Sequence, residues 1–181
     1  MIKKSTLALG NQRLGIMVEI NDRRLPVGIQ SFEEIRKQGC LYVDKTDIIW
    51  QLVNRGKKYN YLSRPRRFGK SVLVDTLEAY FMGKKELFEG LKIMQLETEW
   101  VKRPVIRLDM SRAGAEPDTL RSYLDISFDR LEEEYGITPK PTAKLADRFD
   151  AIIVEVYEQT GQQVAILIDE YDSPLQHSWK T

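Results

Sequence analysis

The sequence is nearly devoid of the residues that build disulfides and zinc sites. It contains one cysteine, Cys40, and one histidine, His177. A lone cysteine cannot form an internal disulfide, and together with one histidine it cannot complete a tetrahedral zinc site. We expect Cys40 to pack in the interior and His177 to lie on the surface of a tail. The scarcity of cysteine favours a reducing, cytoplasmic setting.

Long apolar runs and a charge excess are also absent. No run approaches the roughly 20 residues that cross a bilayer, and polar residues 10–13 interrupt the apolar stretch after the N-terminal lysines, so we expect neither a signal peptide nor a membrane anchor. The 28 Lys and Arg residues nearly balance 27 Asp and Glu residues, for a net charge of +1. Such a balance creates no field that would attract nucleic acid or an anionic membrane to the whole molecule.

What the chain does have is the composition of a globular domain. Hydrophobic residues make up 42% and charged residues 30% of its 181 residues, which is enough for one substantial core and too little for two ordinary domains. We assign residues 1–24 to an N-terminal extension and residues 25–181 to a single domain.

Caps, apolar spacing and turn residues predict helices that alternate with strands. Helices are expected over 31–38, from Thr46 to a stop at Gly56, and over 72–82, 117–135 and 142–160. Strands are expected over 58–63, 104–110 and 164–168. The last of these is a continuous apolar run, typical of a strand buried on both faces of a parallel sheet. The alternation predicts an α/β fold of three layers with a mainly parallel sheet.

A candidate phosphate loop lies between the strand over 58–63 and the next helix. Its sequence, RPRRFGKS, ends in Gly69-Lys70-Ser71, the last three positions of the P-loop or Walker A pattern, but Arg64 stands where the pattern has its first glycine. A glycine allows amide groups to turn toward phosphate, the helix start attracts anions, and the lysine and serine suit phosphate and magnesium. We expect ATP to contact Arg64, Arg66, Arg67, Phe68, Gly69, Lys70, Ser71 and Val72.

A candidate acidic partner ends the strand over 164–168, where Asp169 and Glu170 follow an apolar run. In P-loop ATPases, an acid at the end of a strand holds magnesium, and a neighbouring glutamate can orient the attacking water. We therefore expect Ser71 and Asp169 to bind magnesium, and Lys70 and Glu170 to be catalytic. Taken singly, each motif has an ordinary alternative: an exposed lysine at a helix start, or acids that end a buried strand. Their combination favours phosphate chemistry.

Two further groups of polar residues are weaker candidates. Asp109 ends its own strand and could line the same crevice, although capping of the following loop is the favoured interpretation. Tyr42, Asp44 and Lys45 lie near a helix start, where structural and functional interpretations weigh equally.

Four segments together resemble the bacterial AAA-ATPase-like family over about residues 25–175. They read LPVGIQSFEEIRKQGCLYVDKTDIIWQLV, YLSRPRRFGKSVLVDTLEAYFMGKKELFEGL, PVIRLDMS and ILIDEYDSPL. RPRRFGKS is the usual loop of that family, so the resemblance implies that Arg64 is a family feature. It also implies that YVDKT is a signature, without assigning it a role. Members commonly continue past the IDEYD strand with more ATPase core and a PD-(D/E)XK nuclease-like domain, so we expect this chain to be truncated there, after its Walker B strand.

These patterns lead to one functional expectation and two alternatives. We expect magnesium-dependent ATP binding, with hydrolysis in a longer form of the protein. The first alternative is a non-catalytic regulatory or interaction module, in which nucleotide orders a surface for a protein partner or for another copy of the chain. The second is a nucleic-acid-handling motor, although three arginines without interleaved aromatic residues give it no support.

Overall fold

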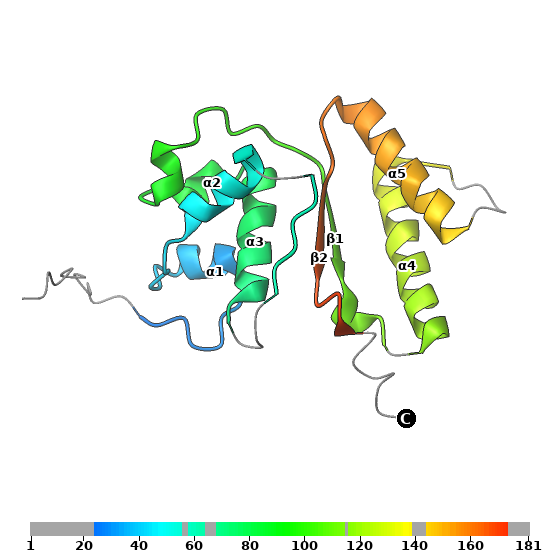
Figure 1. The fold of residues 1–181 in the computed structure, drawn as a ribbon, viewed down its shortest axis with the longest axis horizontal. Coiled ribbons are helices and arrows are strands. Elements are labelled where there is room, and N and C mark those ends of the chain that lie inside the picture. The colour runs from blue at the N-terminus through cyan, green and yellow to red at the C-terminus, as the bar shows by residue number, and fades with distance from the viewer. Residues whose placement is uncertain (1–23, 56–57, 64–67, 115, 139–143, 174–181) are drawn as a thin grey trace, which may run out of the picture.

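The computed structural model describes residues 24–55, 58–63, 68–114, 116–138 and 144–173. The assignment of an N-terminal extension and the expectations for Arg64, Arg66, Arg67 and His177 lie outside these residues, apart from residue 24 itself. The described part is a mixed α/β fold in which two groups of helices flank a short sheet (Figure 1). None of its helices is long and apolar enough to cross a membrane.

The sheet in the described part consists of two parallel strands, β1 (Val105–Asp109) and β2 (Ala165–Asp169). They pair in register from Val105 opposite Ala165 to Asp109 opposite Asp169. Both strands lie within one residue of their predicted ends. Because parallel strands end at the same edge, Asp109 and Asp169 lie side by side at the carboxyl edge of the sheet.

Two helices connect β1 to β2 and cover one face of the sheet (Figure 1). These are α4 (Pro117–Tyr135) and α5 (Leu145–Thr160), which end at the left-handed glycines Gly136 and Gly161. Apolar side chains of β1 and both helices form a buried core, made of Ile106, Leu108, Phe128, Ile152 and Val156. The predicted helices 117–135 and 142–160 are thus confirmed, the second from Leu145 onward.

A second group of helices lies on the other side of the sheet. It comprises α1 (Phe32–Lys37), α2 (Thr46–Arg55), α3 (Lys70–Phe81) and the 3-10 turns η1 (Lys85–Phe88) and η2 (Lys92–Gln95). As predicted, Ser31 caps α1 by accepting a hydrogen bond from the Glu34 amide at 3.4 Å. The shared core contains Phe32, Ile49, Ala79, Tyr80, Leu87, Phe88, Leu91 and Ile93. Of this group, α3 contacts both strands. Because α3 is the helix at the end of the phosphate loop, this packing brings the loop helix against the sheet.

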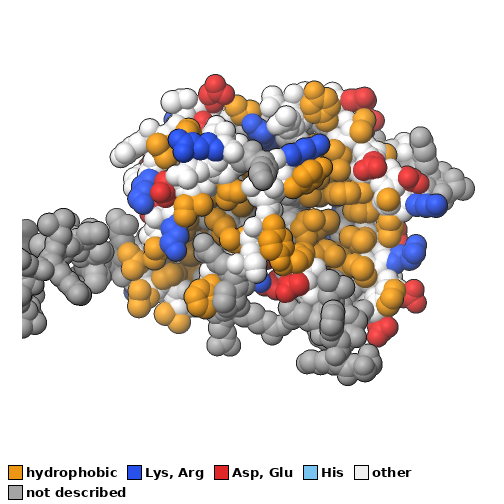
Figure 2. Space-filling view, in the orientation of Figure 1, with side chains coloured by type: hydrophobic (Ala, Val, Ile, Leu, Met, Phe, Trp, Pro, Cys, Tyr) orange, Lys and Arg blue, Asp and Glu red, His pale blue; other side chains and the backbone are white. Residues whose placement is uncertain are grey.

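The two strands are covered unequally, which corrects one prediction. Ile106 and Leu108 of β1 are 0% and 5% exposed, whereas their register partners on β2, Ile166 and Ile168, are 40% and 48% exposed. Burial of β2 on both faces is therefore wrong for the described part, because α4 and α5 pack over β1 and leave that face of β2 half open. Figure 2 shows apolar side chains gathered between the two helix groups.

A second correction concerns residues 58–63, which were expected to form a strand. All six residues are exposed and none is in a strand. An alternating pattern predicts a strand only where a neighbouring strand can pair with it. In the described part β2 pairs with β1 alone, and residues 58–63 form no ladder with it.

Candidate functional site

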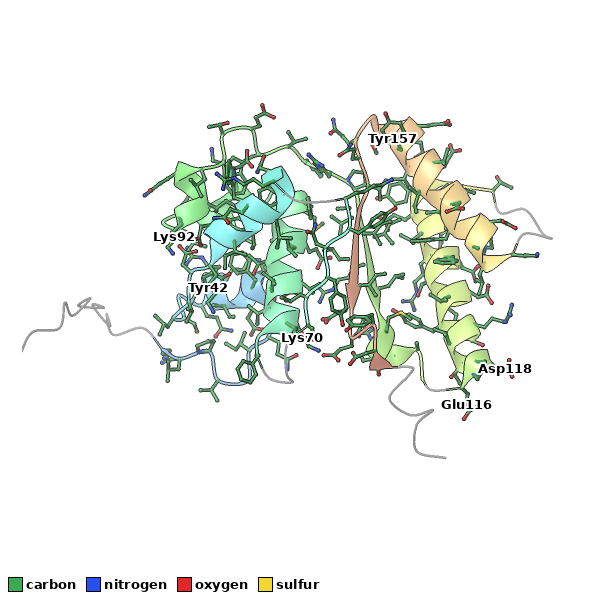
Figure 3. The ribbon with its side chains drawn as sticks, in the orientation of Figure 1. Tyr42, Lys70, Lys92, Glu116, Asp118 and Tyr157 are labelled. Carbon is green, nitrogen blue, oxygen red and sulfur yellow. The ribbon has the colours of Figure 1, made fainter. Side chains whose placement is uncertain are left out.

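The first element of the candidate site is the start of α3, where Gly69 precedes Lys70. Gly69 is the N-cap residue and has the left-handed angles φ 72° and ψ 26°, which favour glycine. Gly69 has no side chain to cap the helix, and among the described residues no side chain accepts from the first amide groups of α3, which are the groups that bind anions at a helix start. Phe68, just before it, is 64% exposed. Figure 3 shows Lys70 at this end of α3, close to where β2 ends.

The second element is the end of β2, which lies against α3. The Lys70 Nζ atom is 3.5 Å from Oε1 of Glu170, and the two side chains are 17% and 30% exposed. The fold therefore joins the two motifs that the sequence analysis paired, although they are far apart along the chain. An ammonium group that is only partly hydrated and faces a carboxylate is well placed to exchange that partner for a phosphate.

The residues expected to hold magnesium have suitable chemistry. Asp169 is 7% exposed, and its Oδ1 accepts a hydrogen bond from the Glu170 amide at 2.9 Å. Ser71 is half-buried in the first turn of α3. The described residues contain no cluster of three or more metal-ligating side chains. Magnesium is usually bound by one or two carboxylates together with phosphates and waters, and in P-loop proteins a serine or threonine hydroxyl is a further ligand, so the chemistry of Asp169 and Ser71 fits that ion.

Asp109, opposite Asp169 at the same edge, is already engaged. Its Oδ1 accepts hydrogen bonds from the Ser111 amide at 3.1 Å and the Ser111 hydroxyl at 2.6 Å. Its Oδ2 lies 3.3 Å from Nε of Arg112. Asp109 thereby caps the turn η3 (Met110–Arg112), which confirms the structural interpretation.

Two tyrosines at this site were not singled out from the sequence. Tyr61 precedes the phosphate loop and Tyr171 follows Glu170. Their rings meet edge to face, with centroids 5.2 Å apart and planes at 62°, and their hydroxyl groups are hydrogen-bonded to each other. This hydrogen bond, with smaller effects of partial burial and nearby charge, raises the pKa of Tyr171 to about 12. The signal in the sequence was a tyrosine three residues before Arg64 and another directly after Glu170.

Comparison with known proteins agrees with this geometry. A family model described as "Predicted AAA-ATPase" matches residues 26–181. The chain belongs to this AAA-ATPase-like family. Membership confirms the resemblance and gives the chain an ATP-related function at the level of the family.

A relative in Azotobacter chroococcum mcd 1 also matches the chain. It is named "Uncharacterized protein in vnfD 5'region" and is 38% identical over 157 residues, which are 84% of this chain and 30% of that protein. This chain thus spans about 30% of the length of the relative. No solved structure gives a significant match.

The YVDKT segment of this AAA-ATPase-like chain joins helices and lies away from Lys70 in Figure 3. Asp44 accepts hydrogen bonds from the Thr46 amide (2.9 Å), the Thr46 hydroxyl (2.7 Å) and the Lys92 amide (2.7 Å). The fully buried Thr46 hydroxyl accepts from the Ile93 amide at 3.1 Å. Asp44 and Thr46 therefore hold the start of α2 against η2, while Lys45 is exposed.

Two other residues of the same region have structural surroundings. The Tyr42 hydroxyl lies 3.3 Å from the Thr76 hydroxyl of α3, and burial raises the pKa of Tyr42. Cys40 is 3% exposed, which confirms its packing role. Val72, the last of the residues expected to contact ATP, lies in α3, where its carbonyl accepts a hydrogen bond from the Thr76 hydroxyl at 2.6 Å.

Proposed function

We propose that this chain is a magnesium-dependent ATP-binding domain with the three-layer P-loop fold. The observation that carries the proposal is the 3.5 Å contact between Lys70, at the start of α3, and Glu170, at the end of β2. Helices on both sides of a parallel sheet support the fold, and membership of the AAA-ATPase-like family supports ATP as the ligand. The low cysteine content supports a cytoplasmic setting.

Each residue of the site has a proposed role. Lys70 binds the β- and γ-phosphates, and the amide groups at the start of α3 bind phosphate oxygens. Ser71 and Asp169 hold magnesium, which supplies positive charge that neutralises the phosphates. Glu170 orients water for hydrolysis in a longer form of the protein. Arg64, Arg66, Arg67 and Phe68 complete the ATP contacts from the loop.

Calorimetric titration of the chain with ATP and magnesium tests the proposal. Lys70→Ala should weaken binding by at least about tenfold, because a hydrogen-bonded charge pair is worth 1.5–3 kcal/mol. Lys85→Ala, at an exposed lysine in η1, is the matched control and should bind like the unaltered chain. Equal affinity of the Lys70→Ala variant and the unaltered chain would overturn the proposal.

Turnover separates the catalytic proposal from the alternative of a non-catalytic module. In a longer form of the protein, Glu170→Gln should abolish most phosphate release while ATP still binds. Unchanged phosphate release would remove the catalytic role of Glu170 and leave ATP binding as a means of ordering a surface for a partner. Salt-dependent binding to DNA or RNA would be the distinguishing result for a nucleic-acid motor.

A further inference from the structure

Two consecutive residues after β2 contact both flanks of the phosphate loop. Glu170 pairs with Lys70, near the C-terminal end of the loop, at 3.5 Å. Tyr171 packs edge to face on Tyr61, which precedes the loop, and shares a hydrogen bond with its hydroxyl. The acidic turn is therefore joined to both ends of the loop.

The backbone of Glu170 explains how neighbouring side chains reach two different flanks. In an extended strand, consecutive side chains point to opposite faces. Glu170 has a φ of 48°, a left-handed conformation that is uncommon for a residue with a side chain and that breaks this alternation. The Ser173 amide donates to the Glu170 carbonyl at 2.8 Å and closes the turn. Strained residues of this kind concentrate at functional sites.

The tyrosine contact contributes little to the core. Tyr61 is 71% exposed and Tyr171 is 40% exposed, so their rings bury only part of their surface. Neither ring belongs to the two clusters of buried residues that form the cores. What the contact does is to join Tyr61, near the end of residues 58–63 that leads into the loop, to the turn after β2.

We propose that Tyr61 and Tyr171 are positioning residues that hold the chain just before the phosphate loop against the acidic turn that contacts Lys70. The proposal rests on the proposed ATP-binding function. With these parts held together, Lys70 would bind phosphate and Asp169 would be placed to hold the magnesium that accompanies it. Without the contact, the loop still binds nucleotide, but the additional affinity that magnesium provides is reduced.

Calorimetry with and without magnesium separates the affinity for ATP alone from the additional affinity that magnesium provides. Three variants are compared with the unaltered chain: Tyr61→Phe, Tyr171→Phe and the double variant. Each single variant should bind ATP without magnesium within about twofold of the unaltered chain, while the gain from magnesium falls by about three- to tenfold, the usual effect of one lost hydrogen bond. The double variant should lose no more than either single one, because both changes remove the same contact. Tyr59→Phe, at a tyrosine that is 81% exposed, is the matched control.

Nuclear magnetic resonance of chains with labelled tyrosines provides a readout that does not depend on ATP. Cross-peaks between the ring protons of Tyr61 and Tyr171 are expected from a centroid separation of 5.2 Å. They should persist when ATP and magnesium are added. Their absence from the unaltered chain would overturn the proposal.

The outcomes distinguish the positioning role from the proposed function. No ATP binding by the unaltered chain would remove both. Normal ATP binding with an unchanged magnesium gain in the tyrosine variants would overturn the positioning role alone. Equal weakening with and without magnesium would show a structural contact, and additive losses in the double variant would show two independent residues; either result also overturns it.

Discussion

At the scale of single residues, the site contains two residues in the left-handed backbone conformation, and the conformational free energy of the two differs. Gly69 has φ 72° before Lys70, and Glu170 has φ 48° after Asp169. Glycine adopts this conformation readily, whereas a residue with a Cβ pays about 1–2 kcal/mol. Gly69 thus lets α3 start without a capping side chain, whereas Glu170 is held in an unfavourable backbone conformation at the point where it contacts Lys70.

The role of Gly69 can be separated from its effect on stability. A Cβ at Gly69 or at Gly136 would meet no atom within 4 Å, and Gly136 has a similar φ of 64°. Gly69→Ala and Gly136→Ala should therefore each lower the free energy of unfolding by about 1–2 kcal/mol, measured in urea. Only Gly69→Ala should weaken ATP binding, measured by calorimetry. Equal ATP affinity in both variants would contradict a role for the Gly69 backbone at the phosphate.

The contact between Lys70 and Glu170 predicts competition for the lysine. Lys70 lies 3.5 Å from the Glu170 carboxylate, so a phosphate that binds Lys70 competes with that partner. Glu170→Gln removes the competing charge and should tighten binding of ADP without magnesium by about two- to fivefold, the range expected for a weak ion pair. Glu86→Gln, at an exposed position in η1, should leave the affinity unchanged. Weaker ADP binding by Glu170→Gln would show that the pair does not restrain Lys70.

At the scale of elements, Asp44 connects α2 to η2 and makes that connection sensitive to acid. Partial burial alone would raise the pKa of Asp44, but hydrogen bonds from Thr46 and Lys92 outweigh it and hold the pKa below its ordinary value. The stability that Asp44 contributes is therefore complete above the ordinary pKa of about 4 and is lost as the pH falls through the lower folded value.

Asp44→Ala tests this connection. The variant should lower the free energy of unfolding by about 1–3 kcal/mol near neutral pH, because several donors lose their acceptor. The difference from the unaltered chain should shrink as the pH falls below about 4, because Asp44 then binds a proton in the unfolded chain and, at still lower pH, in the folded chain. Denaturant titrations over this pH range measure it. Asp47→Ala, whose carboxylate is 3.7 Å from Lys92 and 36% exposed, is the control and should cost less than about 1 kcal/mol. A loss that does not vary with pH would contradict the role of the charge.

The ion network between α4 and α5 is another connection between elements. Arg148 of α5 is 13% exposed and contacts Asp125 at 2.9 Å, Asp129 at 2.8 Å and Glu132 at 2.5 Å on α4. The side chain of Glu132 is only 5% exposed, so little water could replace Arg148 as a partner of its carboxylate.

Removing the arginine should therefore be far more damaging than removing an exposed acid. Arg148→Ala leaves Glu132 as an uncompensated buried charge and should cost about 3–5 kcal/mol of unfolding free energy in urea. Asp129, 67% exposed, is the matched partner for comparison, and Asp129→Asn should cost less than about 1 kcal/mol. Similar losses of unfolding free energy for Arg148→Ala and Asp129→Asn would show that burial of Glu132 does not require its ion pair with Arg148.

At the scale of the whole molecule, the sheet joins two helix groups that have different tasks (Figure 1). The α1–α3 group places the start of α3 beside the end of β2, and the α4–α5 group buries β1. The candidate site lies where the first group meets the carboxyl edge of the sheet, the usual place for ligands in α/β folds.

Much of the fold was predictable because it depends on neighbours in the sequence. The capping residue Ser31, the stop at Gly136 and the apolar run of β2 each act within a few residues, and all three predict their elements correctly. The prediction of a strand over 58–63 was wrong because its alternating pattern is equally consistent with a strand and with an exposed segment. The prediction that β2 is buried on both faces was wrong because its burial depends on how far α4 and α5 extend across the sheet.

The candidate site also has a part that the sequence predicted and a part that it did not. The sequence by itself determined the two motifs around Lys70 and Asp169, since the chemistry of phosphate and magnesium requires particular residue types at short spacings. Only the tertiary structure decided that Lys70 meets Glu170, that Tyr61 meets Tyr171, and that Asp44 serves the join between α2 and η2. These contacts link residues far apart along the chain, and the distance between such residues is set by the packing of whole elements, which no local pattern encodes.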